Sequence, residues 1–128
     1  MDRILIVEDN PDLLLILDQL LSTEYDVVAA RRGEDGVVLA REMKPDLVIL
    51  DLQLPGMDGI ETGSWIKRER APEFVPILVL TAMTAPGDAE AILATGCCDM
   101  YLAKPAPLDV IRERVRDLLM QGAAGGVA

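Results

Sequence analysis

Short runs of aliphatic residues alternate with amphipathic stretches along the chain, and this alternation constrains the fold more than any other feature of the sequence. Residues 4–7, 47–50 and 77–80 are aliphatic throughout. Strands of this kind are buried on both faces, as in a parallel sheet that is covered by helices. Residues 25–30 and 100–103 have weaker strand patterns, which brings the expected number of strands to five.

A helical pattern follows each of these strands. Asn10 and Pro11 supply the N-cap and the first-turn proline of a helix that runs to about Leu21. The other helices are expected at about residues 34–43, 59–70, 86–95 and 107–120. Five strand–helix units in series predict an α/β fold with a doubly wound parallel sheet and right-handed crossovers. Residues 1–121 are expected to form one domain, and residues 122–128 a flexible tail.

The charge and the absence of histidine exclude several functional classes. The chain has 22 acidic and 12 basic residues, which gives a net charge of −10. Binding to a nucleic-acid backbone requires clustered Lys and Arg, so no nucleic-acid partner is expected. Without an imidazole, neither a Ser-His-Asp triad nor a histidine metal site can form. Any bound metal should therefore be a hard cation held by oxygen atoms.

The N-terminal segment and the cysteines indicate the compartment. The chain reaches Glu8 and Asp9 after four aliphatic residues, too few for a signal peptide or a membrane span. We therefore expect a cytoplasmic protein without a membrane partner. A disulfide between the adjacent Cys97 and Cys98 would be strained, so both are expected to be reduced. Small buried hydrophobic residues are the favoured interpretation of the pair, and a redox or metal role is the alternative.

Polar residues follow the carboxyl ends of four expected strands. Glu8 and Asp9 follow the first strand, and Asp51 ends the third. Thr81 ends the fourth strand, and Lys104 follows the fifth. Because the carboxyl ends of parallel strands share one edge of a sheet, where ligands bind, we expect these side chains to converge.

The converging groups suit one kind of chemistry. Three carboxylates at one place repel one another unless a cation lies between them. Carboxylate oxygens, a backbone carbonyl and waters are ligands that Mg²⁺ prefers. With Lys104 and Thr81 as donors to the oxygens of an anion, the set could move a phosphoryl group onto Asp51.

The sequences "VEDN", "DLQLPGMDG", "LTA" and "KP", in this order and spacing, resemble the receiver domain of two-component response regulators. The resemblance extends over residues 3–120 and implies a flavodoxin-like sheet with the strand order 2-1-3-4-5. It places the first and fifth helices on one face of the sheet and the other three on the opposite face. Since the pattern ends with the fifth helix, we expect a stand-alone receiver like those of chemotaxis and cell-cycle phosphorelays. "VEDN", "SWIK" and "GC" favour the cell-cycle kind.

The resemblance also implies a phosphoacceptor site. By the family pattern, Asp51 accepts a phosphoryl group from a histidine kinase or a histidine phosphotransfer protein. Asp9 and Asp51 bind Mg²⁺ together with the backbone carbonyl of Gln53, and Glu8 holds metal-bound water. Gln53 and Met83 flank the expected path of the attacking water, so we expect them to influence the lifetime of the phosphorylated state.

The remaining implied residues connect the site to a response. Lys104, across a cis bond to Pro105, pairs with the phosphoryl group, while Thr81 closes on it and Tyr101 turns inward. The surface formed by the fourth helix, fifth strand and fifth helix then changes and controls binding of a downstream protein target. Such a protein is not an enzyme, since it catalyses only its own phosphoryl transfer and autodephosphorylation. A monomer is expected, and phosphorylation-dependent dimerisation stays open.

The first helix carries more leucines than one buried stripe needs. At 100° steps, one stripe toward the sheet is formed by Leu13, Ile16, Leu17, Leu20 and Leu21. Leu14 lies at the edge of that stripe, and Leu15 lies nearly opposite. Partner kinases of the family dock on this helix, so we expect Leu14 and Leu15 to contact the phosphodonor. Ordinary surface leucines are the alternative.

Three other functional interpretations remain at this stage. A phosphatase with an aspartyl nucleophile would need a second Asp two residues after Asp51, where Gln53 stands. A flavodoxin-like cofactor binder should have a first loop rich in Ser, Thr and Gly, whereas this loop is "EDNPD". The third is an interaction module with the receiver fold that acts without phosphorylation, against which the intact set of polar residues argues.

Overall fold

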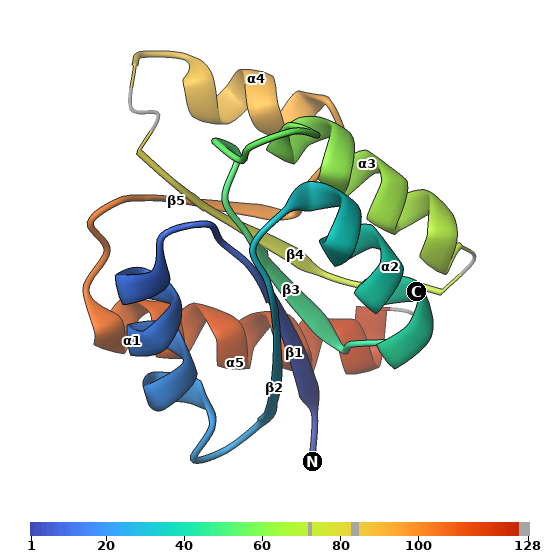
Figure 1. The fold of residues 1–128 in the computed structure, drawn as a ribbon, viewed down its shortest axis with the longest axis vertical. Coiled ribbons are helices and arrows are strands. Elements are labelled where there is room, and N and C mark those ends of the chain that lie inside the picture. The colour runs from blue at the N-terminus through green and yellow to red at the C-terminus, as the bar shows by residue number, and fades with distance from the viewer. Residues whose placement is uncertain (72, 83–84, 126–128) are drawn as a thin grey trace.

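The computed structural model describes residues 1–71, 73–82 and 85–125, in which five strands alternate with five helices (Figure 1). The strands are β1 (Arg3–Val7), β2 (Asp26–Ala30), β3 (Leu47–Leu50), β4 (Ile77–Thr81) and β5 (Met100–Ala103). The helices are α1 (Pro11–Leu21), α2 (Gly33–Met43), α3 (Gly59–Arg70), α4 (Asp88–Ala94) and α5 (Leu108–Gly125). Every strand predicted from the sequence is present.

The strands form one parallel sheet in the order β2-β1-β3-β4-β5. This confirms the doubly wound, flavodoxin-like α/β fold that the sequence predicted. The chain runs outward from β1 to β2 and then returns past β1 to β3, so the strand order reverses between β1 and β3. In such sheets, ligands bind beyond the carboxyl ends of the strands at this point of reversal.

Alternate residues of the central strands enter two separate cores, because successive side chains of a strand point to opposite faces. On one face, strand residues such as Leu5 and Val48 pack with residues of α2, α3 and α4. On the other face, strand residues such as Ile4 and Ile49 pack with residues of α1 and α5. Figure 1 shows the same division, with α1 and α5 below the sheet and the other three helices above it. The expected distribution of the helices is confirmed.

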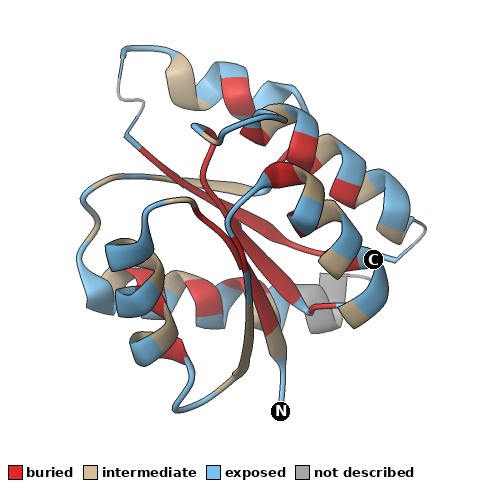
Figure 2. Ribbon diagram, in the orientation of Figure 1, coloured by how far each residue is buried: buried red, intermediate tan, exposed pale blue. Residues whose placement is uncertain are grey.

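Burial differs between the centre and the edges of the sheet. All residues of β3 and β4 are buried, whereas β2 and β5 are mostly half-buried (Figure 2). An edge strand has a single neighbouring strand, so less of its surface is covered. This explains why β2 and β5 have the weaker apolar patterns in the sequence.

Helix α1 begins as predicted but buries a narrower stripe. The Asn10 side chain accepts hydrogen bonds from the backbone N–H of Asp12 at 2.9 Å and of Leu13 at 3.3 Å, which confirms it as the N-cap. Leu17 is fully buried, but Ile16 is 43% exposed. The prediction that Ile16 faces the core was therefore wrong. Only Leu17 and Leu21 of this helix are fully buried against the sheet, and Ile16 instead borders a pocket beside α5.

Helix boundaries shift at the C-terminal end of the chain. Helix α4 is shorter than residues 86–95, and α5 continues to Gly125 instead of ending near Met120. Residues 126–128 of the expected tail lie outside the described residues. None of the helices in the described part of the chain combines the length and the apolar character that crossing a membrane requires. Cys97 and Cys98 are both buried with free thiols, as the sequence predicted.

Candidate functional site

The backbone of the central strands brings three acidic residues to one edge of the sheet. Val7 and Leu50 are paired at the ends of β1 and β3, and the N–H of Asp51 donates to the Val7 carbonyl at 3.0 Å. The N–H of Glu8 donates to the carbonyl of Ala30 in β2 at 3.0 Å. Glu8 and Asp51 therefore leave adjacent strands side by side. The two side chains are only 3% and 5% exposed, respectively, so the fold holds both carboxyl groups away from bulk water.

Lys104 joins these two carboxylates. Its Nζ lies 2.8 Å from Glu8 Oε1 and 3.1 Å from Asp51 Oδ2. The Lys104 backbone is held at the end of β4, because its N–H donates to the Thr81 carbonyl at 2.8 Å. The peptide bond between Lys104 and Pro105 is cis, as predicted. Lysine, glutamate and aspartate from three strand ends thus meet although they are separated by up to 96 positions in the sequence.

Asp9 completes an acidic cluster with Glu8 and Asp51. One carboxylate oxygen from each of the three residues lies within 4.8 Å of the others. Mg²⁺ binds oxygen at about 2.1 Å, so two ligands on opposite sides of the ion are about 4.2 Å apart. Ligands on adjacent sides of the ion are about 3.0 Å apart, so oxygens within 4.8 Å of one another lie near the range that one ion and its bound water can span. The donor set, the spacing and the burial therefore fit a magnesium ion.

Burial and ion pairing oppose each other in the pKa values of this cluster. Desolvation raises the pKa of Glu8 above its ordinary value, although hydrogen bonds from Lys104 and from the Asn10 N–H counteract it. Burial alone would lower the pKa of Lys104, but its hydrogen bonds to Glu8 and Asp51 outweigh burial and raise it. Lys104 therefore stays an ammonium ion at neutral pH, and Glu8 is the carboxylate that burial disfavours in its charged form.

The connection after β3 places further groups beside Asp51. The N–H of Gln53 donates to Asp51 Oδ1 at 3.1 Å, which orients the carboxylate. Gly59, the first residue of α3, has no side chain at a point where a Cβ would lie 2.2 Å from Leu52 Cα. The start of α3 can therefore approach the end of β3. The roles predicted for Gln53 and Met83 stay predictions, and Met83 lies outside the described residues.

Two further predicted residues lie on β4 and β5. Thr81 is fully buried at the last position of β4, paired in register with Ala103. Tyr101 is half-buried against the core between the sheet and α2, α3 and α4. Its hydroxyl oxygen is buried and finds no hydrogen-bond partner among the described residues. Burial raises the pKa of Tyr101, and the charge of Asp88 acts in the same direction.

A contact that the sequence did not predict fixes the loop after β1. Arg31, which follows β2, donates from Nη2 to the Asp9 carbonyl at 3.1 Å. Asn10 was predicted only as a helix cap, but its N–H also donates to Glu8 Oε2 at 3.1 Å. Arg31 could have been identified from the sequence because it directly follows β2, and β2 ends at the same edge of the sheet as β1.

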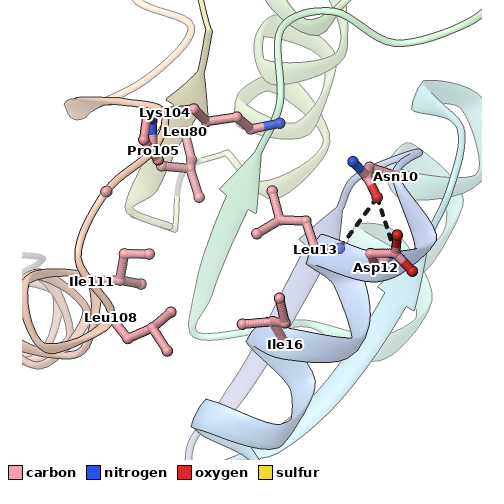
Figure 3. A pocket seen from close by; sticks show the side chains of 10 residues that line it. Asn10, Asp12, Leu13, Ile16, Leu80, Lys104, Pro105, Leu108 and Ile111 are labelled. Carbon is pink, nitrogen blue, oxygen red and sulfur yellow. Dashed lines mark hydrogen bonds between the residues drawn. The ribbon is translucent and has the colours of Figure 1, made fainter.

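An apolar pocket of about 440 Å³ opens beside the acidic cluster, between α1 and the segment that joins β5 to α5 (Figure 3). Leu13 and Ile16 of α1 face Leu108 and Ile111 of α5 across it. Lys104 lies at its border, so the pocket adjoins the site. A second pocket, of about 450 Å³, lies between α1 and β2 and includes Leu14 and Leu15. Leu15 is 56% exposed, whereas Leu14 also packs against the core under α1.

Comparisons with known proteins agree on one family. The model of the response regulator receiver domain matches residues 4–116. The polar-differentiation response regulator DivK of Brucella anthropi is 33% identical over 117 residues, covering 91% of this chain and 94% of that protein. A CheY-like receiver domain protein from Methanospirillum hungatei has a TM-score of 0.89 at 25% identity and covers 98% of this chain and 99% of its own. The receiver domain of a sensor histidine kinase from Pseudomonas aeruginosa, solved with a magnesium ion in its active-site cleft, has a TM-score of 0.82 at 30% identity. That alignment covers 92% of this chain and 97% of the other.

Proposed function

Because the chain belongs to the family of response regulator receiver domains of two-component systems, we propose that it is a phosphoacceptor in which Asp51 receives a phosphoryl group. The donor is a histidine kinase or a histidine phosphotransfer protein. One observation carries the proposal above all others: a buried carboxylate at the end of β3 shares a lysine with a second buried carboxylate, beside a third. Structural ion pairs do not need an excess of negative charge at one point, but a cation-dependent phosphoacceptor does.

The acidic cluster would hold Mg²⁺. Asp9 and Asp51 would bind it directly together with the Gln53 carbonyl, and Glu8 would hold its water. When bound, the ion offsets the repulsion between the carboxylates and the incoming phosphoryl oxygens. The magnesium ion in the Pseudomonas aeruginosa receiver supports this part of the proposal.

Contacts to both carboxylate oxygens orient Asp51 for nucleophilic attack. Oδ1 accepts the Gln53 N–H, and Oδ2 pairs with the Lys104 ammonium. In the reaction, an Asp51 oxygen forms the bond to phosphorus as the nitrogen–phosphorus bond of phosphohistidine breaks. The imidazole keeps the electron pair of the broken bond and takes up a proton. Lys104, fixed by its backbone at the end of β4, then pairs with a phosphoryl oxygen, and the Thr81 hydroxyl donates to another.

Tyr101 gives the protein a way to report the modification. Its buried hydroxyl has no hydrogen-bond partner among the described residues. A buried polar group without a hydrogen bond costs free energy, so the present position of Tyr101 is destabilised. A shift of Thr81 toward the phosphoryl group would change the packing beside β5 and allow Tyr101 to turn. The surface of α4, β5 and α5 would then favour a form that binds a downstream target protein. Phosphorylation shifts an existing equilibrium in this scheme.

The phosphodonor would dock along α1, close to both pockets that flank this helix. Leu14 and Leu15 are the contact residues predicted from the sequence, and Leu15→Lys is the cleaner variant because Leu14 also packs against the core. Phosphoryl transfer from a phosphohistidine partner should slow, while phosphorylation by a small phosphodonor should not. Val38→Lys, at a 38% exposed apolar residue of α2, is the matched control. Equal slowing with both donors would count against docking on α1.

The central assignment is tested by Asp51→Asn. We expect this variant to lose incorporation of labelled phosphoryl groups from a small phosphodonor in the presence of Mg²⁺. Glu61→Gln, an exposed position on α3, should be labelled like the wild type. Labelling of Asp51→Asn at the wild-type rate would overturn the assignment. Phosphorylation by a kinase is consistent with the proposed cytoplasmic location. The only catalysis that we propose is the protein's own phosphorylation and dephosphorylation.

A further inference from the structure

The connection from β3 to α3 determines where two groups of the site lie. It begins with Asp51 and Gln53 and ends at Asp58, the N-cap of α3. Its base is closed by backbone geometry, because the N–H of Gly59 donates to the Leu52 carbonyl at 3.0 Å. This bond does not reach the tip of the connection, Pro55 to Met57, which is held by another element.

Glu34 of α2 holds that tip. Its Oε1 accepts the backbone N–H of Met57 at 2.6 Å. The same oxygen would lie 2.8 Å from a Cβ at Gly56, whose φ of +76° also favours glycine. Arg32 Nη2 lies 3.2 Å from Glu34 Oε2 and balances the charge. A carboxylate in the first turn of a helix is also favoured by the helix dipole. Oε2 has no hydrogen-bond partner among the described residues, so the bond from Met57 is the one hydrogen bond that the structure gives this carboxylate.

Close contact at Gly33, directly before Glu34, limits how far the connection can shift toward α2. A Cβ at Gly33 would lie 2.3 Å from Thr62 Oγ1 and 2.8 Å from the Met57 carbonyl. Thr62 in turn donates from Oγ1 to the Asp58 carbonyl at 2.7 Å. The start of α2 and the start of α3 thus both lie close to Met57, and Glu34 supplies the hydrogen bond that joins α2 to Met57.

We propose that Glu34 is a positioning residue for the phosphoacceptor site. By fixing Met57, it fixes the path of the chain back to Gln53 and hence the N–H that orients the Asp51 carboxylate. The Gln53 carbonyl is held in the same way for Mg²⁺, so this inference rests on the proposed function. Glu34 is not among the residues that we propose to bind the phosphoryl group or the ion.

Glu34→Ala and Glu34→Gln separate the hydrogen bond from the charge. The alanine variant removes the acceptor, whereas the glutamine side-chain oxygen can still accept the Met57 N–H. Asp35→Ala is the matched control, because Asp35 is an exposed acidic residue in the same turn of α2. Two properties are measured for each variant: hydrogen exchange and chemical shifts of the Met57 and Gln53 amides, and Mg²⁺ affinity by titration.

We expect Glu34→Ala to speed exchange of the Met57 amide by about 10-fold or more and to shift the Gln53 amide resonance. Its Mg²⁺ affinity should fall about 5-fold, which corresponds to about 1 kcal/mol, the typical net contribution of one hydrogen bond. Phosphorylation should slow at low Mg²⁺ and recover at saturating Mg²⁺. Glu34→Gln and Asp35→Ala should match the wild type in all these measurements.

Three outcomes would overturn the inference. Unchanged Mg²⁺ affinity in Glu34→Ala, with the Met57 amide exchanging faster, would show that the contact is structural only. Equal losses in Asp35→Ala or in Glu34→Gln would assign the effect to charge. A wild-type protein that binds no Mg²⁺ would refute the proposed function as well, and Met57 exchange would still show whether the Glu34 contact forms. Circular dichroism on each variant confirms that it is folded.

Discussion

The two edges of the sheet both gather charged side chains, but they neutralise them differently. At the amino edge, Arg3 Nε lies 2.7 Å from Asp26, and Lys67 Nζ lies 2.5 Å from Asp99. Each of these carboxylates has its own cation, and the side chains of the Arg3 pair are 36% and 46% exposed. At the carboxyl edge, two buried carboxylates share Lys104 and a third lies beside them.

This difference distinguishes charges that only form ion pairs within the fold from charges that can bind a further cation. An exposed ion pair contributes only about 0–1 kcal/mol to the free energy of unfolding, and its carboxylate needs no further cation. Buried carboxylates that outnumber their cations retain an unmet demand for positive charge. The amino edge is therefore complete by itself, and the carboxyl edge is complete only with a further cation.

The largest contrast is expected on removal of a cation from each edge. Lys104→Met leaves Glu8 and Asp51 buried without a counter-charge and should lower the free energy of unfolding by about 3–5 kcal/mol. Arg3→Met removes a half-exposed pair and a hydrogen bond to the Met43 carbonyl, and should cost about 1–2 kcal/mol. Urea unfolding in the presence of a chelator measures both. Losses of equal size would remove the distinction between the two edges.

Mg²⁺ should stabilise the protein through the carboxyl edge alone. At a free concentration 100-fold above the dissociation constant, an ion that binds only the folded chain adds about 2.7 kcal/mol to the free energy of unfolding. Asp9→Asn should lose most of this gain, whereas Asp26→Asn at the amino edge should keep it. Thermal unfolding over a magnesium titration checks the expectation. A gain that survives in Asp9→Asn would place the ion elsewhere.

Neutralising one carboxylate should have opposite signs at the two edges when no divalent ion is present. Asp9→Asn relieves repulsion within the acidic cluster and should raise the free energy of unfolding by about 0.5–1 kcal/mol. Asp99→Asn weakens bonds from Lys67 and from the Ile77 N–H, which is 2.8 Å away, and should lower it by about 1–2 kcal/mol. Chelator-containing urea titrations of both variants decide the matter, and a loss of stability in Asp9→Asn would contradict the picture of an under-neutralised edge.

The sequence predicted the fold and the members of the site for a common reason. Apolar runs specify buried parallel strands, and parallel strands place whatever follows them at one edge, so Glu8, Asp51 and Lys104 could be brought together on paper. The exposure of Ile16 could not be predicted, because helical periodicity does not show how wide a stripe of the helix its neighbours cover. The bond from Met57 to Glu34 also had no periodic signal. It depends on how closely α2 approaches the connection after β3, which only the packed structure fixes.

The smallest effect concerns the pH dependence that Glu8 contributes. Burial raises its pKa above the ordinary value of 4.5, so the folded protein binds this proton more tightly than the unfolded chain does. The corresponding stability is present below pH 4.5 and is lost as the pH rises through the pKa of the folded state. Glu8→Gln cannot ionise and should therefore gain stability relative to the wild type as the pH rises from 4.5. The gain is limited because hydrogen bonds from Lys104 and the Asn10 N–H offset part of the effect of burial. Urea unfolding of both proteins between pH 4.5 and 7, with a chelator, gives the difference directly. A difference that stays constant or changes in the opposite direction would mean that Lys104 fully compensates Glu8, and the demand for another cation would then fall on Asp9 and Asp51 alone.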